Sequence, residues 1–325
     1  MEKRKLQKTG GRSYYLILPK KWIVENSLQK NGRVYVFEKK SGSLLVTSAK
    51  QRETNLAKTI QADQVSAEEI FREILALYTT GIAEIMIKGK SIDRAKRLSV
   101  RKALQFLIGY ELVEESSVKV VLKSILGIDN FSFSESVMKM HQMTTEMLKD
   151  AIISLEKRNA DNARDVIERD FEVDRHYLLI RRIHNSLLAD RLSEEELDTS
   201  LEESDYHRFV ATQLERIADH AGKIAETVLT AELNFNPKFR EMLTARAKKC
   251  LAGLEEIGPI IESRDKSKAH EAISLGQKDE KKILGLQKAI VRYKANDAFI
   301  IVDSLNRIRR YLMNIAEKII YQSLA

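Results

Sequence analysis

Hydrophobic and polar positions divide the chain into three segments with different periodicities. In the first 50 residues, short runs rich in strand-forming side chains occupy positions 3–8, 14–18, 33–37 and 43–47. Pro19 suits the start of a helix, and Asn31-Gly32 is a turn signal. The pattern predicts a small all-β unit of four strands with a short helix. Because such a unit buries little apolar surface, we expect it to dimerise.

Residues 51–130 combine helical and strand-like patterns. Helical periodicity is found at 66–78 and 92–107, and strand-like runs are found at 82–87 and 118–122. Ser66 followed three residues later by Glu69 matches a capping box, which marks the start of a helix. The segment is predicted to be a small α/β connecting domain, and it contains no motif that indicates chemistry.

From residue 134 to residue 325 the pattern is helical throughout. Its breaks fall at 159–162, 193, 234–237, 264–267 and 295–297, which predicts six long helices. The run that begins Arg216-Ile217 recurs 91 residues later as Arg307-Ile308. Each copy lies in the third helix of its half, so we predict a duplicated three-helix bundle, 134–233 and 237–325. The fold class is therefore multidomain and mainly α.

Composition places the chain among folded proteins of the cytoplasm. It is 43% hydrophobic and 31% charged, and no apolar run approaches the roughly 20 residues of a membrane-spanning helix. The N-terminus lacks the apolar core of a signal peptide. Cys250 is the single cysteine, which excludes an internal disulfide framework and fits a reducing compartment. We expect a cytoplasmic protein without a membrane span.

Positive charge is concentrated at the N-terminus. Residues 1–60 hold 14 Lys and Arg against four Glu, whereas the other 265 residues hold 41 basic and 43 acidic side chains. Such a basic head on a near-neutral body indicates a polyanionic partner, although charge that only maintains solubility is the alternative. One of Tyr14 and Tyr15 is expected to face the core. The candidate DNA-binding residues are Lys3, Arg4, Lys5, Lys8, Arg12, Lys20 and Lys21.

Two pairs of acidic residues are candidate metal ligands. Asp170 and Asp174 are four residues apart on one predicted helix, and Glu215 and Asp219 have the same spacing on the next. This spacing puts both carboxylates of a pair on one helical face, where they repel each other unless a cation lies between them. Carboxylates suit Mg, Ca, Mn or iron. The alternative is a solvated face with salt bridges to nearby arginines, namely Arg169, Arg175 and Arg216.

The second half of the repeat lacks these acids. At the 91-residue offset, Asn306 replaces Glu215 and Arg310 replaces Asp219, so any metal site is confined to the first bundle. His220 points about 100° away from Asp219 around the helix and is expected to be a surface or core histidine. The sequence has no nucleophile motif and no phosphate-binding glycine loop. We therefore predict that the chain is not an enzyme.

Residues 1–50 resemble the AbrB/SpoVT/MazE-like swapped-hairpin domain. The resemblance is carried by Gly11 and Ser13, by the Leu18-Pro19-Lys20 end of the strand, and by Asn31-Gly32. Leu18 replaces the usual isoleucine, and Arg33 replaces a usual aspartate. The resemblance implies an intertwined homodimer that binds DNA through basic residues of the first hairpin.

Residues 134–325 resemble the PhoU family. The resemblance rests on the Asp170/Asp174 pair, on the run LERIADHAGKIAE at 214–226, and on the duplication. It implies a regulator of phosphate uptake that binds iron or another divalent cation through the carboxylate pairs. It also implies a phosphate transporter or a sensor kinase as partner. The order of an AbrB-like head and a PhoU-like body looks like an archaeal arrangement.

Together these features predict a phosphate-linked transcriptional regulator whose head binds DNA and whose helical body senses a metal, a ligand or a protein partner. The domains are predicted at 1–50, 51–130 and 134–325. The alternative function is a PhoU-like adaptor that docks on a transporter or kinase and uses the head only to dimerise. A carboxylate-bridged metalloenzyme is disfavoured because no histidine lies three residues after a glutamate.

Overall fold

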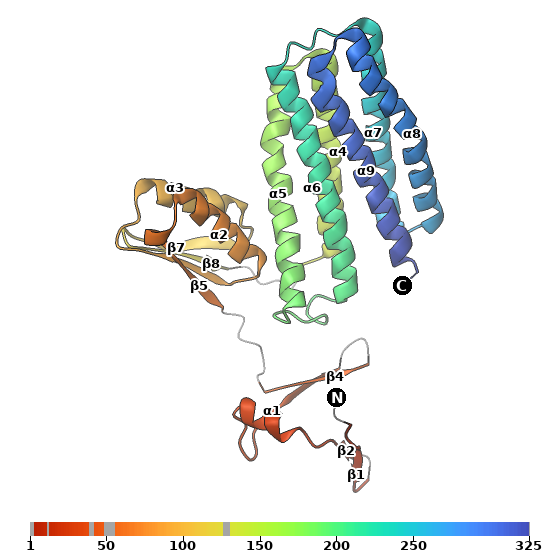
Figure 1. The fold of residues 1–325 in the computed structure, drawn as a ribbon. Helices are drawn as coiled ribbons and strands as arrows, with labels where there is room; N and C mark the ends of the chain where they lie inside the picture. Colours follow the sequence, from red (N-terminus) through yellow and green to blue (C-terminus); the bar gives the residue numbers. More distant parts are fainter. Residues whose placement is uncertain (1–2, 12, 39–41, 49–55, 126–130, 325) are drawn as a thin grey trace. The chain divides into compact units, whose positions relative to one another are not determined.

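The computed structural model describes residues 3–11, 13–38, 42–48, 56–125 and 131–324, and Figure 1 shows its elements. The chain divides into two compact units, residues 1–54 and residues 55–325. The predicted candidate Arg12 lies outside the described residues.

The N-terminal unit consists of two separate antiparallel hairpins and one short helix. Strand β1 (Gln7–Thr9) pairs with β2 (Ser13–Tyr15), and β3 (Tyr35–Glu38) pairs with β4 (Leu44–Thr47). Helix α1 is Lys20–Glu25. The predicted strands are thus present, but as two two-stranded sheets and not one sheet.

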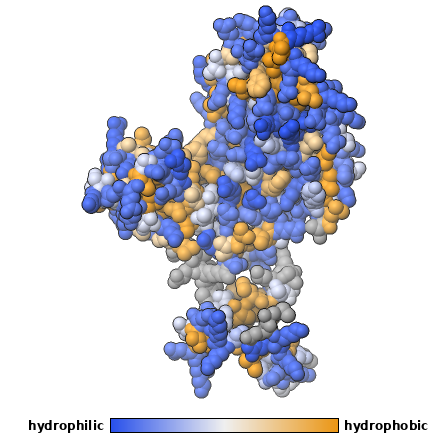
Figure 2. All heavy atoms as spheres, viewed as in Figure 1, coloured by the Kyte–Doolittle hydropathy of each residue, from blue (hydrophilic) through white to orange (hydrophobic). Residues whose placement is uncertain are grey.

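None of the described residues of this unit is buried. Tyr14 and Tyr15 are 65% and 44% exposed, so the prediction that one of them faces a core is wrong for a single chain. The physical reason is size, because strands of three or four residues without a covering layer cannot enclose a core. Figure 2 shows apolar side chains on the surface of this unit.

The connecting domain is a four-stranded sheet in the order β5-β6-β8-β7. Its strands are β5 (Ala57–Gln61), β6 (Glu84–Lys88), β7 (Tyr110–Glu115) and β8 (Lys119–Ser124). A short 3₁₀ turn η1 (Ala62–Gln64) precedes helix α2 (Ala67–Thr79), and α3 (Arg94–Phe106) precedes β7.

Local sequence signals explain part of this domain. The capping box at α2 is present, since Ser66 N–H donates to Glu69 Oε2 at 2.7 Å and Glu69 N–H donates to Ser66 Oγ at 3.2 Å. The sequence pattern missed β5 and β7. Strand β7 has three glutamates and a register shift between Leu112 and Glu114, which obscures the alternation of apolar positions.

The helical body consists of six long helices, as predicted. They are α4 (Phe133–Lys157), α5 (Ala160–Leu188), α6 (Leu201–Thr230), α7 (Pro237–Ser263), α8 (Lys266–Tyr293) and α9 (Phe299–Gln322), with a 3₁₀ turn η2 (Asn296–Ala298) before α9. The predicted breaks coincide with capping residues, such as Asn159 before α5 and Asp265 before α8.

The two halves of the repeat share one hydrophobic core. Helix α6 packs against α9, and α4 packs against α7, so apolar side chains from both halves form a continuous cluster. Figure 1 shows the six helices side by side. A tandem arrangement of two three-helix groups is thus visible, although the exact domain limits stay a prediction.

The connecting domain packs on α5 through a buried arginine. The Arg182 guanidinium lies over the rings of Tyr78 and Tyr110, at 4.9 and 4.5 Å from their centroids. Its Nη2 donates to Ser124 Oγ at 3.1 Å. The ring of Phe106 in α3 meets Phe171 in α5 edge to face at 4.5 Å. This contact lies next to the first predicted metal ligand, Asp170.

Candidate cation site on helices α5 and α6

The four predicted metal ligands lie on two helices that pack together. Asp170 and Asp174 belong to α5, and Glu215 and Asp219 belong to α6. All four side chains are half-buried. The charges of other members of the group raise the pKa values of Asp170, Asp174 and Glu215. The charges of Lys223 and Arg216 act on Asp219, as they also do on Asp170 and Glu215 respectively. The tertiary structure thus brings the two pairs into one electrostatic cluster.

The arginines that could neutralise this cluster are engaged elsewhere. Arg169 pairs with Asp165 at 2.7 Å and also with Asp150, and Arg175 pairs with Glu172 at 3.1 Å. Arg216 lies over the ring of Tyr311, although its charge still lowers the pKa of Glu215. Among the described residues, no salt bridge joins any of the four carboxylates to a basic side chain. The alternative of ordinary i, i+4 salt bridges therefore does not describe this face.

Burial and mutual repulsion shift the acid equilibria of the cluster. Burial, followed by repulsion from Asp174 and Asp219, raises the pKa of Asp170 to about 7. Burial and repulsion from Asp219 raise the pKa of Asp174 to about 6. The pKa of Glu215 rises to about 7 for the same two reasons. A positive charge at this face would remove the repulsion and keep the carboxylates ionised.

The structure adds Glu226 to the predicted group. Its charge contributes to the raised pKa of Asp170, whereas Lys223 lowers that pKa. Gly222 precedes Lys223 on α6, and an added Cβ at Gly222 would be 3.9 Å from Asp170 Oδ2. The signal for Glu226 was its place seven residues after Asp219, on the same face of the helix.

The donor chemistry fits a hard or intermediate cation, because every candidate ligand is a carboxylate. The side-chain positions do not form a closed coordination shell. Among the described residues, no three His, Cys, Asp or Glu side chains converge closely enough to hold a metal ion. The metal assignment of Asp170, Asp174, Glu215 and Asp219 therefore stays a prediction.

This face lies within a segment that matches a known family model. Residues 137–228, from α4 to α6, match the model described as the PhoU domain. Residues 137–228 are thus similar to a PhoU domain.

Two curated relatives extend this likeness beyond the PhoU domain. Each is a phosphate-specific transport system accessory protein PhoU homolog of Streptococcus pneumoniae, one from serotype 4 strain TIGR4 and one from strain R6. Each is 24% identical over 215 residues, which is 62% of this chain and 95% of the relative. These names describe the two relatives as accessory proteins of phosphate-specific transport.

Solved PhoU structures share the fold of the helical body. The phosphate transport system regulatory protein PhoU from Streptococcus pneumoniae has a TM-score of 0.52 at 21% identity and covers 59% of this chain and 93% of its own. PhoU from Pseudomonas aeruginosa has a TM-score of 0.54 at 19% identity and covers 59% and 95%. None of these matches identifies an AbrB-like domain, so the resemblance of residues 1–50 stays a prediction.

His220, within the matched segment, is a core histidine. Its Nδ1 lies 3.1 Å from Ser304 Oγ on α9, and the side chain is buried. Burial lowers its pKa to about 4, so the ring is neutral near pH 7. It packs against the second half of the repeat and is not a member of the carboxylate cluster.

The second half of the repeat does not rebuild the acidic face of the PhoU domain. Asn306 accepts a hydrogen bond from Arg309 Nη2 at 3.2 Å, and Arg310 is exposed. The partly buried carboxylate of Asp279 is paired with Arg246 at 3.0 Å.

The predicted DNA-binding residues that the structure describes are all exposed. They are Lys3, Arg4, Lys5, Lys8, Lys20 and Lys21. Lys8 lies on β1, and Lys21 on α1 lies 3.7 Å from Glu25. No helix in the described ranges is long and apolar enough to cross a membrane.

Proposed function

We propose that this chain is a cytoplasmic regulatory adaptor of a phosphate transport system. The observation that supports the proposal most directly is the PhoU domain match at residues 137–228. Relatives named as accessory proteins of phosphate-specific transport, aligned over nearly their whole length, support it further. In this role the helical body docks on a transporter subunit or on a sensor kinase and catalyses no reaction.

The acidic face on α5 and α6 is the regulatory site of this adaptor. Asp170 and Asp174 from α5 would hold a divalent cation, iron or another metal, together with Glu215 and Asp219 from α6. The cation would supply positive charge to a half-buried cluster whose own arginines are engaged elsewhere. Because both helices contribute ligands, binding of the cation stabilises one distance between α5 and α6. The connecting domain, which packs on α5 through Arg182, then responds to the distance between the two helices.

Metal content and partner capture test the proposal together. The full chain is purified without chelator, and its metals are measured beside a D174N/D219N variant and a Glu168→Gln control, an exposed acid on the same helix. We expect bound metal in the wild type and the control, and a loss in the double variant. Equal metal content in all three would contradict the cation site. Failure to co-purify a phosphate transporter subunit or sensor kinase from the native host would contradict the adaptor role.

DNA binding by the head is a second candidate function. Its support is the net charge of +10 over residues 1–60 and the exposure of the described basic side chains. A homodimer is part of this proposal, because the unit has no buried residue in the described parts of one chain and exposes Ile17 and Leu44 at 56% and 66%. A second copy would cover such apolar side chains.

A gel shift across a salt series separates the two functions. The DNA fragments are the promoters of the phosphate transport genes of the host. DNA binding predicts a shift that weakens steeply with salt and is lost in a Lys3→Glu, Lys5→Glu variant. The adaptor function alone predicts no shift at low salt, and it predicts that a chain without residues 1–50 still binds its protein partner.

A further inference from the structure

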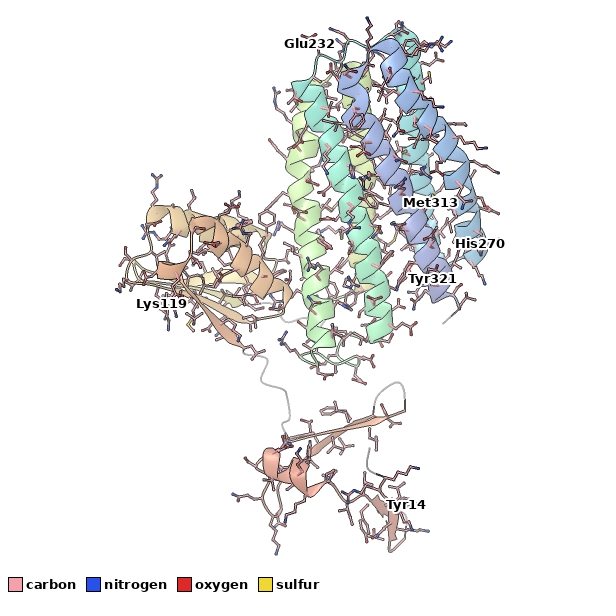
Figure 3. All side chains as sticks on the ribbon, viewed as in Figure 1. Tyr14, Lys119, Glu232, His270, Met313 and Tyr321 are labelled. Atoms are coloured by element: carbon pink, nitrogen blue, oxygen red, sulfur yellow. The ribbon has the colours of Figure 1, made fainter. Side chains whose placement is uncertain are left out.

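A small cavity lies between helices α7, α8 and α9, in the second half of the repeat. Its volume is about 50 Å³, which is enough for several water molecules. Among its lining residues are Cys250 and Gly253 of α7, Gly276 and Asp279 of α8, and Arg309 and Met313 of α9. Figure 3 labels Met313, which marks the α9 side of the cavity.

Two buried guanidinium groups belong to this region. Arg246 and Arg309 are each only 6% exposed. Arg246 pairs with Asp279 at 3.0 Å, and the Asp279 side chain is 15% exposed, so the two opposite charges of this largely buried pair offset each other. The nearest carboxylate of Arg309 is Glu280, at 3.9 Å and 53% exposed. One buried positive charge, that of Arg309, therefore has only a distant and solvated partner.

The side chain of Arg309 is fixed in place but not fully paired. Its Nη1 donates to Gly276 O at 2.9 Å, and its Nη2 donates to Asn306 Oδ1 at 3.2 Å. Its buried Nε has no hydrogen-bond partner in the described ranges of the chain, and the same holds for Nε and Nη1 of Arg246. A buried N–H without an acceptor costs about 1–3 kcal/mol. An acceptor bound in the cavity would remove that cost at Arg309.

The other charged side chains that line the cavity are Lys249 and Glu256, which are both exposed, and Asp279, which is paired with Arg246. The charge of Asp279 also acts on Arg309 and favours its charged form. Burial raises the pKa of Cys250 to about 12, so the thiol is neutral. Burial also lowers the pKa of Arg309, which means that its surroundings do not fully stabilise the cation. These directions agree with the geometry, in which Asp279 is paired with Arg246 and the carboxylate of Glu280 lies 3.9 Å from Arg309.

We propose that this cavity binds one inorganic phosphate ion. Arg309 contacts the ion and supplies the balancing charge, and Arg246 is a positioning residue that neutralises Asp279. The Asp279 carboxylate selects phosphate over sulfate. Near pH 7 phosphate retains a proton that it can donate to a carboxylate, whereas sulfate has no proton and would leave two acceptors facing each other.

The duplicated body then carries opposite charges at its two sites. The first half presents four carboxylates, and the second half has the buried Arg309 next to the exposed Arg310, which stands at the position of Asp219. The inference rests on the cavity and its charges and does not depend on the proposed adaptor function.

Equilibrium dialysis of the full chain against labelled inorganic phosphate tests the site. The buffer contains EDTA, which removes any phosphate held through a metal at the acidic face, and chloride is kept constant. Arg309→Met is compared with the wild type and with a matched control, Arg310→Met, whose arginine is exposed and does not line the cavity. Unlabelled sulfate is added in a second series.

We expect saturable binding of one phosphate per chain in the wild type and in Arg310→Met. Loss of one charged contact should weaken binding at least about tenfold in Arg309→Met. Sulfate should compete at least about tenfold more weakly than phosphate. No saturable binding in the wild type, or equal affinity in Arg309→Met, would overturn the proposal, and equal competition by sulfate would overturn the role of Asp279.

A second variant keeps the test decisive if Arg309→Met does not fold, as judged by circular dichroism. Ala272→Leu places a larger apolar side chain at a half-buried lining position and leaves both arginines in place. Loss of phosphate binding in this folded variant supports the site. Unchanged binding contradicts it. Because EDTA is present throughout, these results are independent of the metal and partner assays.

Discussion

Neutralising Asp170 should stabilise the metal-free protein, and the effect should depend on pH. The folded pKa of Asp170 is about 7, raised above the ordinary 3.8 by burial and then by its acidic neighbours. Between about pH 4 and pH 7, the carboxyl group of Asp170 therefore holds a proton in the folded protein but not in the unfolded chain. Stability falls as pH rises through this window, and the full cost is present above pH 7.

The magnitude follows from the same shift. Three pKa units correspond to about 4 kcal/mol, but the carboxyl is half-buried, and water screens part of the repulsion. We therefore expect a cost of about 1–2 kcal/mol at pH 8. Asp170→Asn resembles the protonated acid in shape and removes the charge. It should recover this free energy at pH 8 and change stability by only a few tenths of a kcal/mol at pH 4.5.

Urea unfolding in EDTA, followed by circular dichroism at both pH values, measures the difference. The matched control is Glu168→Gln on the same helix, whose acid is exposed and lies outside the cluster. Equal stability of Asp170→Asn and the wild type at pH 8 would refute the reasoning, as would a gain of the same size at both pH values. Adding a divalent cation at pH 8 should stabilise the wild type more than Asp170→Asn.

Three further predictions concern other parts of the molecule. Arg182→Met should loosen the connecting domain from α5 and speed its proteolysis, whereas Arg181→Met should not, because Arg182 alone lies over the buried rings of Tyr78 and Tyr110. His220→Gln should reduce the stability that the protein loses as pH falls from about 6.5 to about 4, because the buried ring stays neutral in the folded protein while the same ring in the unfolded chain takes up a proton. Urea unfolding of the variant and the wild type with the same dependence on pH would contradict this. Sedimentation should find a dimer for the full chain and a lighter species for Val36→Lys, whose side chain is 57% exposed.

Much of the fold could be predicted because its signals are local. Capping residues such as Ser66, Asn159 and Asp265 stand at helix starts, and long apolar periodicities identify all six helices of the body. The i, i+4 spacing of Asp170 and Asp174 likewise places two carboxylates on one face without any knowledge of neighbours. Strand β5 was missed because its partner β6 is distant in sequence, and β7 was missed because a register shift against β8 interrupts its apolar alternation.

Local residue patterns and composition were sufficient to predict the six helices, the acidic pairs and the basic head, because each of these features depends on residues within one or two helical turns or on a simple count of charges. The tertiary structure decided which charges meet. It showed that Arg169 and Arg175 pair away from the acidic face, and that Glu226 joins it. It also placed Arg309 beside a cavity, with one N–H that has no partner in the described part of the chain. Charge pairing and burial depend on distances between separate helices, and those distances exist only once the body has folded.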